Sequence, residues 1–65
     1  MKYLLQERDV MRNGFTPWST IRKEPGDEQG GARAEQWLRE IPDAMAERRI
    51  TRGEWILYRH QLTTE

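Results

Sequence analysis

Cysteine is absent from this chain of 65 residues, and histidine and serine occur once each, as His60 and Ser19. Without cysteine there is no disulfide and no thiolate ligand for zinc or an iron–sulfur cluster. A single histidine excludes a histidine-rich metal site. Neither Ser19 nor His60 lies in a nucleophile motif, and the glycines at 26, 30 and 31 lack the Lys-Ser/Thr of a phosphate-binding loop. The sequence therefore predicts no catalytic residue, no metal and no cofactor, in a protein that is not an enzyme.

Excess charge of either sign is also lacking, because 11 Lys and Arg balance 11 Asp and Glu. General nucleic-acid binding usually requires excess positive charge, and mimicry of DNA requires excess negative charge. No apolar run approaches the roughly 20 residues that span a bilayer, and the first residues become charged too early for a signal peptide. We therefore expect a cytoplasmic protein that contacts neither a membrane nor a small-molecule substrate.

The length of the chain limits it to one domain, residues 1–65, with a small core. A domain this short buries only about 60% of its unfolded surface, so its stability is marginal. Small domains usually add a disulfide, a metal or a second subunit. Because the composition excludes the first two, self-association or binding to another protein is an expected way to gain stability.

Two segments near the N-terminus are typical of a β-hairpin, residues 2–11 pairing with 15–23. Asn13-Gly14 between them is the preferred two-residue type I′ turn, whose positions both need positive φ. Pro17 cannot donate a ladder hydrogen bond, so the second strand should lie at an edge or be bulged. Residues 24–31, rich in glycine and acidic side chains, are expected to form a mobile loop.

Residues 32–48 are predicted to be helical, because their apolar side chains recur at spacings of three and four. This apolar stripe consists of Ala34, Trp37, Leu38, Ile41, Ala44 and Met45. Pro42 removes a hydrogen bond and clashes with the preceding turn. We therefore expect the helical layer to be kinked or broken near Glu40–Ile41, with both pieces covering one surface.

The last segment permits two interpretations. Trp55 to Tyr58 is dense in strand-forming residues, which favours a third strand over about 54–62. Thr51-Arg52-Gly53-Glu54 matches a capping box, which would make 52–62 helical. The first interpretation predicts an α+β fold of ββαβ order, with a three-stranded antiparallel sheet and strand one in its middle. The alternative is a β-hairpin plus helices.

One helical layer covers only one face of a sheet, yet the predicted strands carry large apolar groups on both faces. Exposed apolar patches of more than about a few hundred Å² usually mark a partner site. The alternative is that a bulge or the 24–31 loop covers these groups, or that the last segment is a helix. A local cluster of arginines lies close to aromatic residues, and both types are frequent at protein-interface hot spots. The residues expected to bind a partner are Trp18, Arg22, Arg48, Arg49, Arg52, Trp55, Tyr58 and Arg59.

These features predict a small non-enzymatic module that binds a larger protein or itself. In size and style the chain resembles the short products of bacterial viruses and other mobile elements, which often act as inhibitors or adaptors by occupying a surface of a larger protein. The alternative is a nucleic-acid-binding regulator that uses Arg48, Arg49 and Arg52 with Trp55, since arginine and aromatic side chains together bind single strands.

Overall fold

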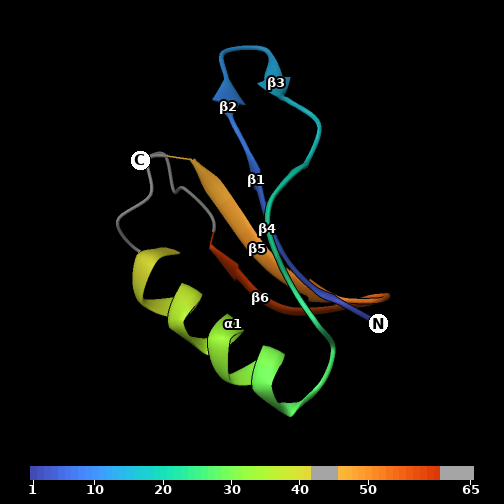
Figure 1. Ribbon diagram of the computed structural model, residues 1–65. Helices are drawn as coiled ribbons and strands as arrows, with labels where there is room; N and C mark the ends of the chain where they lie inside the picture. Colours follow the sequence, from blue (N-terminus) through green and yellow to red (C-terminus); the bar gives the residue numbers. More distant parts are fainter. Residues whose placement is uncertain (42–45, 61–65) are drawn as a thin grey trace.

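The computed structural model describes residues 1–41 and 46–60. Its elements are β1 (Tyr3–Arg8), β2 (Val10–Met11), β3 (Gly14–Phe15), β4 (Ser19–Glu24), α1 (Glu28–Glu40), β5 (Glu47–Arg52) and β6 (Trp55–His60), as Figure 1 shows. The α+β class is confirmed. The sheet differs from the prediction, because it has four strands in the order β4-β1-β5-β6 rather than three.

All neighbouring strands of this sheet are antiparallel. A strand that returns after the helix does pair with β1 and place it inside the sheet, as expected, but that strand is β5. The strand predicted over 54–62 is β6, which pairs with β5 and lies at the edge. β2 and β3 form a separate two-stranded ribbon that projects beyond the sheet (Figure 1).

The strand β5 was not predicted, because the helix was expected to continue to residue 48. Its sequence, Glu-Arg-Arg-Ile-Thr-Arg, lacks the apolar alternation of an ordinary strand. Its charged residues instead meet complementary partners on β1. Arg8 binds Glu47 through Nη2 and Oε1 at 2.7 Å, and the Nε of Arg48 donates to Oε1 of Glu7 at 3.0 Å. Pairing with a distant strand therefore stabilises a segment whose local pattern is not that of a strand.

The favoured interpretation of this segment as a strand is confirmed by β6, and the alternative, a helix that starts from a capping box at residues 51–54, is wrong. Arg52 pairs with Trp55 across a tight turn formed by Gly53 and Glu54. Gly53 has φ +60°, which suits the first central position of a type II′ hairpin turn, where glycine is favoured. The turn at Gly53 and Glu54 thus takes the place of a helix here, and Trp55–His60 is the strand β6. Residues 61 and 62 lie outside the described residues.

The first hairpin is confirmed, but its turn lies one residue earlier than predicted. Arg12 and Asn13 occupy the turn, and Met11 pairs with Gly14. No non-glycine residue among those described has positive φ, so the turn is not of type I′. Gly14, with φ +137°, carries the unusual backbone conformation instead. β4 is an edge strand, as expected from Pro17, and its bulge falls at Ile21, which the register with β1 skips.

The helix α1 begins at Glu28, so residues 28–31 belong to it rather than to the expected loop. Asp27 caps the helix, and its Oδ1 accepts a hydrogen bond from the backbone N–H of Gly30 at 2.7 Å. A Cβ on Gly30 would collide with the carbonyl of Pro25. Gly30, which was assigned to the loop, therefore lies in the first turn of α1, close against Pro25.

The helix ends at Glu40, with Ile41 as its C-cap, one residue before Pro42 in the sequence. The predicted continuation to residue 48 is wrong, since 47–52 is β5; its intermediate part, 42–45, lies outside the described residues. The buried face of α1 carries Ala34, Trp37 and Ile41, at spacings of three and four. These side chains pack with Leu5 of β1 and Ile50 of β5 to form the core.

Candidate protein-binding surface

The helix α1 packs on β1 and β4 and leaves the part of the same sheet face at β6 uncovered. Between α1 and β6 lies an apolar groove with a volume of about 520 Å³. We call it the α1–β6 groove. Its lining residues include Tyr3, Ala34, Leu38, Ile50, Leu57 and Tyr58. Glu28 and Glu35 of α1 also line it, so its helical wall is acidic.

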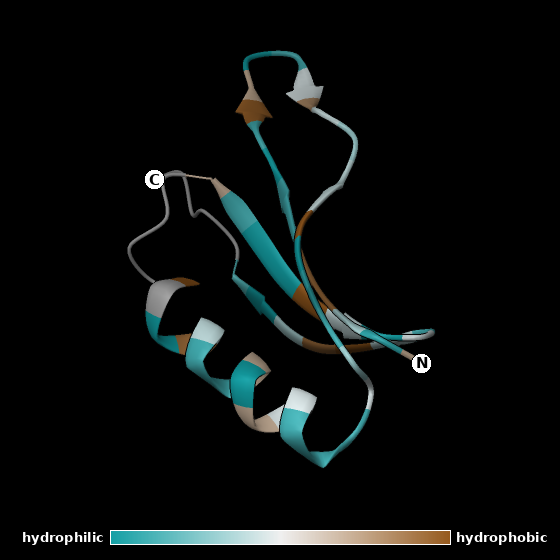
Figure 2. Ribbon diagram, viewed as in Figure 1, coloured by the Kyte–Doolittle hydropathy of each residue, from teal (hydrophilic) through white to brown (hydrophobic). Residues whose placement is uncertain are grey.

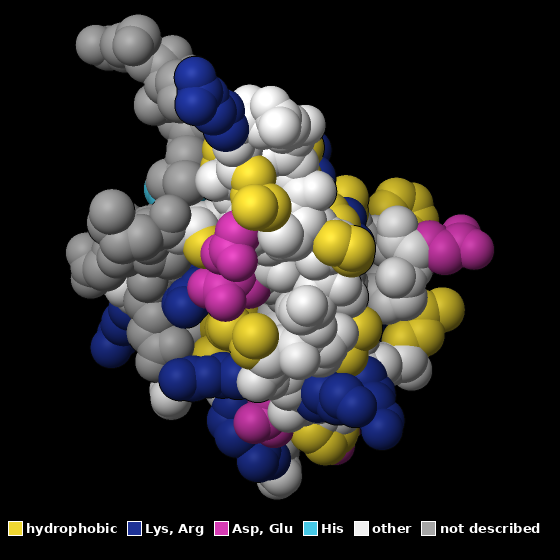
Figure 3. Space-filling view, turned by 90° about the horizontal axis from the view of Figure 1, so that it is seen from above, with side chains coloured by type: hydrophobic (Ala, Val, Ile, Leu, Met, Phe, Trp, Pro, Cys, Tyr) yellow, Lys and Arg dark blue, Asp and Glu magenta, His cyan; other side chains and the backbone are white. Residues whose placement is uncertain are grey.

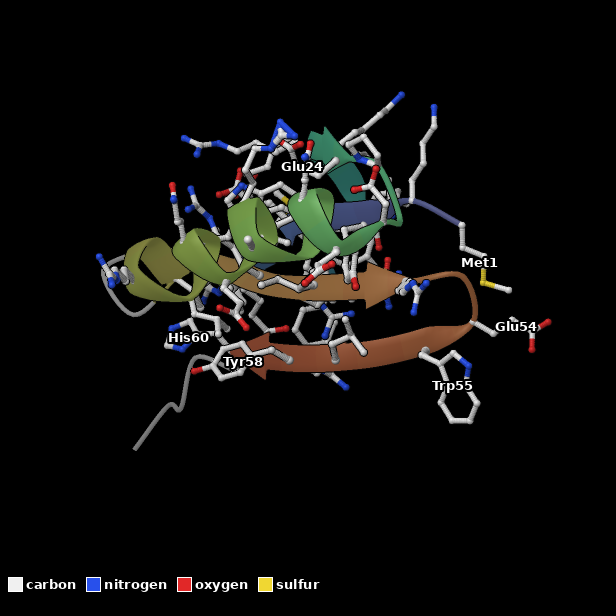
Figure 4. All side chains as sticks on the ribbon, turned by 60° about the horizontal axis from the view of Figure 1, so that its bottom comes forward. Met1, Glu24, Glu54, Trp55, Tyr58 and His60 are labelled. Carbon is white, nitrogen blue, oxygen red and sulfur yellow. The ribbon has the colours of Figure 1, made fainter. Side chains whose placement is uncertain are left out.

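The strand β6 carries the most prominent exposed apolar residues of the four-stranded sheet. Trp55 is 72% exposed, Leu57 is 53% exposed and Tyr58 is 39% exposed. Figure 4 shows Trp55 projecting beside the β5–β6 turn, at a distance from α1, with Tyr58 towards the other end of the strand. Figure 2 shows hydrophobic positions within β6. Exposed apolar runs of this kind mark interaction sites in soluble proteins.

A single molecule therefore does not enclose the aromatic residues on which the binding hypothesis depends. Trp55 and Tyr58 are exposed, while Tyr3 and Trp18 are half-buried. Ile56 and Leu57, which were not predicted as site residues, are also exposed. The signal for them was present, because they lie in the same apolar run as Trp55 and Tyr58.

The strand register separates the arginines that the sequence places together. Residues opposite one another on neighbouring strands share a face, so Arg48 and Arg52 lie on the α1 side with Ile50, while Arg49 lies on the opposite, open face. Arg48 contacts Glu7, and Arg52 donates from Nη2 to the carbonyl oxygen of Gly26 at 3.0 Å. The predicted surface of Arg48, Arg49, Arg52 and Trp55 is therefore not one continuous surface.

The remaining predicted residues divide in the same way. Arg22 lies opposite Leu5 on the α1 side, where Trp55 and Tyr58 also lie by register. Arg59 lies opposite Arg49 on the open face. Trp18 belongs to the open face as well, because the guanidinium of Arg49 stacks on its ring at 4.2 Å from the centroid.

The open face carries an arginine cluster formed by Arg8, Arg49 and Arg59. The Nε of Arg49 donates to Oε1 of Gln6 at 2.7 Å. The guanidinium of Arg8 stacks on the ring of Phe15, at 3.8 Å from its centroid. Burial, together with the positive charges of Arg59 and Arg8, lowers the pKa of the Arg49 guanidinium below its usual value. Like charges directly opposite on neighbouring strands are unfavourable, so the Arg49–Arg59 pair costs stability.

A second exposed apolar patch, also absent from the sequence prediction, lies on the projecting β2–β3 ribbon. Val10, Met11 and Phe15 are all exposed there. The ribbon is fixed at its base by Thr16, whose Oγ1 accepts a hydrogen bond from the N–H of Asp9 at 2.8 Å. No sequence signal distinguished these residues from the core residues of an ordinary hairpin.

The residues considered for chemistry lie apart. Ser19, Glu7, Arg48 and His60 form one row across the sheet, which places Ser19 and His60 on opposite edges, separated by three strand spacings of roughly 4.8 Å each. Within the described ranges, no three His, Asp or Glu side chains gather as metal ligands would. The helical residues described here form no segment with the length and apolarity that crossing a bilayer requires.

The sequence matches no protein-family model, and no curated protein and no solved structure matches it significantly. The function is therefore argued from the surfaces described above.

Proposed function

We propose that the protein is a small, non-catalytic, cytoplasmic protein-binding module that uses the α1–β6 groove and the exposed residues of β6. The observation that carries this proposal is the run of exposed apolar residues from Trp55 to Tyr58 beside an open apolar groove. Interface cores are enriched in aromatic side chains and depleted of charge, and β6 has this composition at its centre. Binding here would make the protein an inhibitor or adaptor of the partner whose surface it occupies.

A pair of matched variants tests this proposal. Leu57→Lys places a charge in the groove, whereas Ile21→Lys makes the same kind of change on β4, at the opposite edge of the sheet. Both side chains are exposed, so neither change should unfold the domain. We expect proteins retained from a lysate by the immobilised wild type to be retained equally by Ile21→Lys and at least tenfold less by Leu57→Lys.

Hydrogen–deuterium exchange of the retained complex locates the contact. Protection is expected in β6 and α1 and not in β4. Equal retention by the two lysine variants, or protection confined to the β2–β3 ribbon, would contradict the proposed site.

The arginine cluster supports a second candidate function, binding of single-stranded nucleic acid on the open face. Arg49 and Arg59 lie directly opposite each other, and the described structure shows Arg49 bound to a neutral amide rather than to a carboxylate. Phosphate groups would relieve this repulsion. This candidate ranks second because the net charge is zero and Glu47 neutralises Arg8. On the face of the molecule seen in Figure 3, acidic, basic and hydrophobic side chains are interspersed.

Fluorescence anisotropy with a labelled single-stranded oligonucleotide at two salt concentrations tests the second candidate. We expect binding at low salt that weakens steeply as salt rises, because phosphate contacts release counterions. Arg49→Gln should reduce the affinity several-fold more than Lys23→Gln, which removes the same charge from the same face but away from the cluster. Absence of binding at low salt, or equal losses in the two variants, would exclude this function.

A further inference from the structure

We propose that the outer edge of β6 pairs antiparallel with β6 of a second copy of this chain across a two-fold axis, so that the two four-stranded sheets become continuous. This inference rests on the proposed function, because it uses the same surface and names the partner. Two-fold dimers are the commonest symmetric assemblies, and in them one surface must be complementary to itself.

The two edges of the sheet differ in how well they are protected against pairing. β4 is preceded by Pro17 and carries Arg22 and Lys23 next to its bulge at Ile21, which are the devices that blunt an edge strand. β6 also has a bulge, at Leu57, and one arginine, Arg59, but its first four residues are Trp-Ile-Leu-Tyr and it has no proline and no lysine. No described strand lies along its outer side. An exposed apolar edge of this kind is a site at which another strand can pair.

An irregularity in β6 selects one register for self-pairing. Ile50 of β5 lies opposite Tyr58 and the next residue, Thr51, lies opposite Ile56, so Leu57 is a bulge residue. Leu57 and Tyr58 both line the α1–β6 groove and therefore share the α1 side. Because opposed residues lie on the same face, an axis between Leu57 and Tyr58 is the one that matches faces along the whole of β6.

In this register every opposed pair joins residues of the same face. Trp55 lies opposite His60 of the second copy, and Leu57 opposite Tyr58, all on the α1 side. Ile56 lies opposite Arg59 on the open face. Moving the axis by half a residue in either direction would place α1-side residues opposite open-face ones.

The charges of β6 also suit a second copy in this register. Arg59 of each copy lies opposite Ile56 of the other, so no like charges are opposed. The two Arg59 side chains are three residues apart along the strands, roughly 10 Å, which is about one Debye length at physiological salt. Shifting the axis onto Arg59 would instead oppose two guanidinium groups.

A second copy also supplies the stabilisation that the small core lacks. The core cluster holds Leu5, Ala34, Trp37, Ile41 and Ile50, with Tyr3 packed against it. Pairing through β6 would place Tyr58 of each copy beside Leu57 of the other and bury apolar surface at the outer wall of each groove. Burial of this surface is favourable at about 25 cal/mol per Å² of apolar area.

The absence of native cysteine permits a clean test by disulfide trapping with Ile56→Cys and Arg59→Cys. In the proposed register these two positions oppose each other in different copies, at the Cα separation of about 5 Å that antiparallel strands and disulfides share. Two Ile56→Cys copies would hold their thiols three residues apart, about 10 Å, which is too far for a disulfide. Oxidation of an equimolar mixture should therefore yield at least tenfold more mixed dimer than either self-linked dimer, as read by mass spectrometry. A statistical mixture, or no linked product, would overturn the proposal.

Sedimentation equilibrium of the unmodified chain provides the second measurement. We expect a reversible monomer–dimer equilibrium that Leu57→Lys abolishes and Ile21→Lys preserves. A wild type that stays monomeric at every concentration refutes self-pairing. The proposed function still stands in that case if the wild type and Ile21→Lys retain another protein from the lysate that Leu57→Lys does not retain. If the chain is monomeric and that capture also fails, both proposals are refuted.

Discussion

Trp37→Ala is expected to unfold the protein. Trp37 is 4% exposed and lies in the core cluster between α1 and the sheet. Truncating a buried tryptophan to alanine costs about 3–5 kcal/mol, through lost burial and the cavity left behind. A single core in a domain of this size rarely supplies more than about 3–5 kcal/mol in total. Far-ultraviolet circular dichroism and urea titration should therefore show a largely unfolded chain without a cooperative transition.

The same substitution at Trp55 is the matched control. Trp55 is 72% exposed, so Trp55→Ala should change the free energy of unfolding of the monomer by no more than about 0.5 kcal/mol. The measurement belongs at a concentration low enough to keep the chain monomeric, since Trp55 also lies on the proposed binding surface. Equal effects of the two alanine variants would show that α1 does not bury Trp37 as described.

Glu47→Gln is expected to lower the free energy of unfolding by about 2–3 kcal/mol. The glutamate is 4% exposed and binds both Nε and Nη2 of Arg8, at 2.8 and 2.7 Å. The amide keeps the shape of the side chain but removes the charge, so the guanidinium of Arg8, itself mostly covered, loses its compensating partner. The midpoint of urea unfolding should fall while the slope of the transition stays constant.

Glu7→Gln is the matched control for Glu47→Gln, because Glu7 forms the equivalent pair with Arg48 one position along the same two strands. Both members of that pair keep more solvent contact, and exposed ion pairs contribute about 0–1 kcal/mol. The double variant Arg8→Met, Glu47→Leu should recover part of the loss caused by Glu47→Gln, since it removes both charges together. Similar losses in Glu7→Gln and Glu47→Gln would show that burial does not strengthen the dependence of Arg8 on its partner.

Patterns over a few neighbouring residues predicted the hairpin, the helix and the last strand. The strand-rich segments around Gly14 indicated the first hairpin, and the spacing of Ala34, Trp37 and Ile41 indicated the buried face of α1. The apolar run from Trp55 indicated a strand rather than a helix, although the turn chemistry of Gly53 was needed to decide between them. The error at the start of α1 arose because capping by Asp27 and the close approach of Pro25 to Gly30 depend on how the chain enters the helix.

The binding residues were predicted less well, because sequence proximity was used as a proxy for a shared surface. Arg48, Arg49 and Arg52 are close in the chain, but alternation along β5 sends Arg49 to the face opposite the other two. Arg8, which completes the arginine cluster, is far from Arg49 in the sequence and was not predicted. It lies on the same open face because Arg8 opposes Glu47 in the β1–β5 register.

The amino-acid sequence by itself determined the absence of covalent or thiolate-bound staples, the α+β class, the first hairpin, the helix and a strand after Gly53. These follow from composition, periodicity and turn preferences, which act over a few residues. Only the tertiary structure decided that 47–52 is a strand, that β6 lies at an edge of the sheet and that α1 leaves a groove beside it. Those features depend on pairing between residues far apart in the sequence, such as Arg8 and Glu47, which are 39 positions apart. Complementary charges on two distant strands have no local periodicity, so they become recognisable only when the register brings them together.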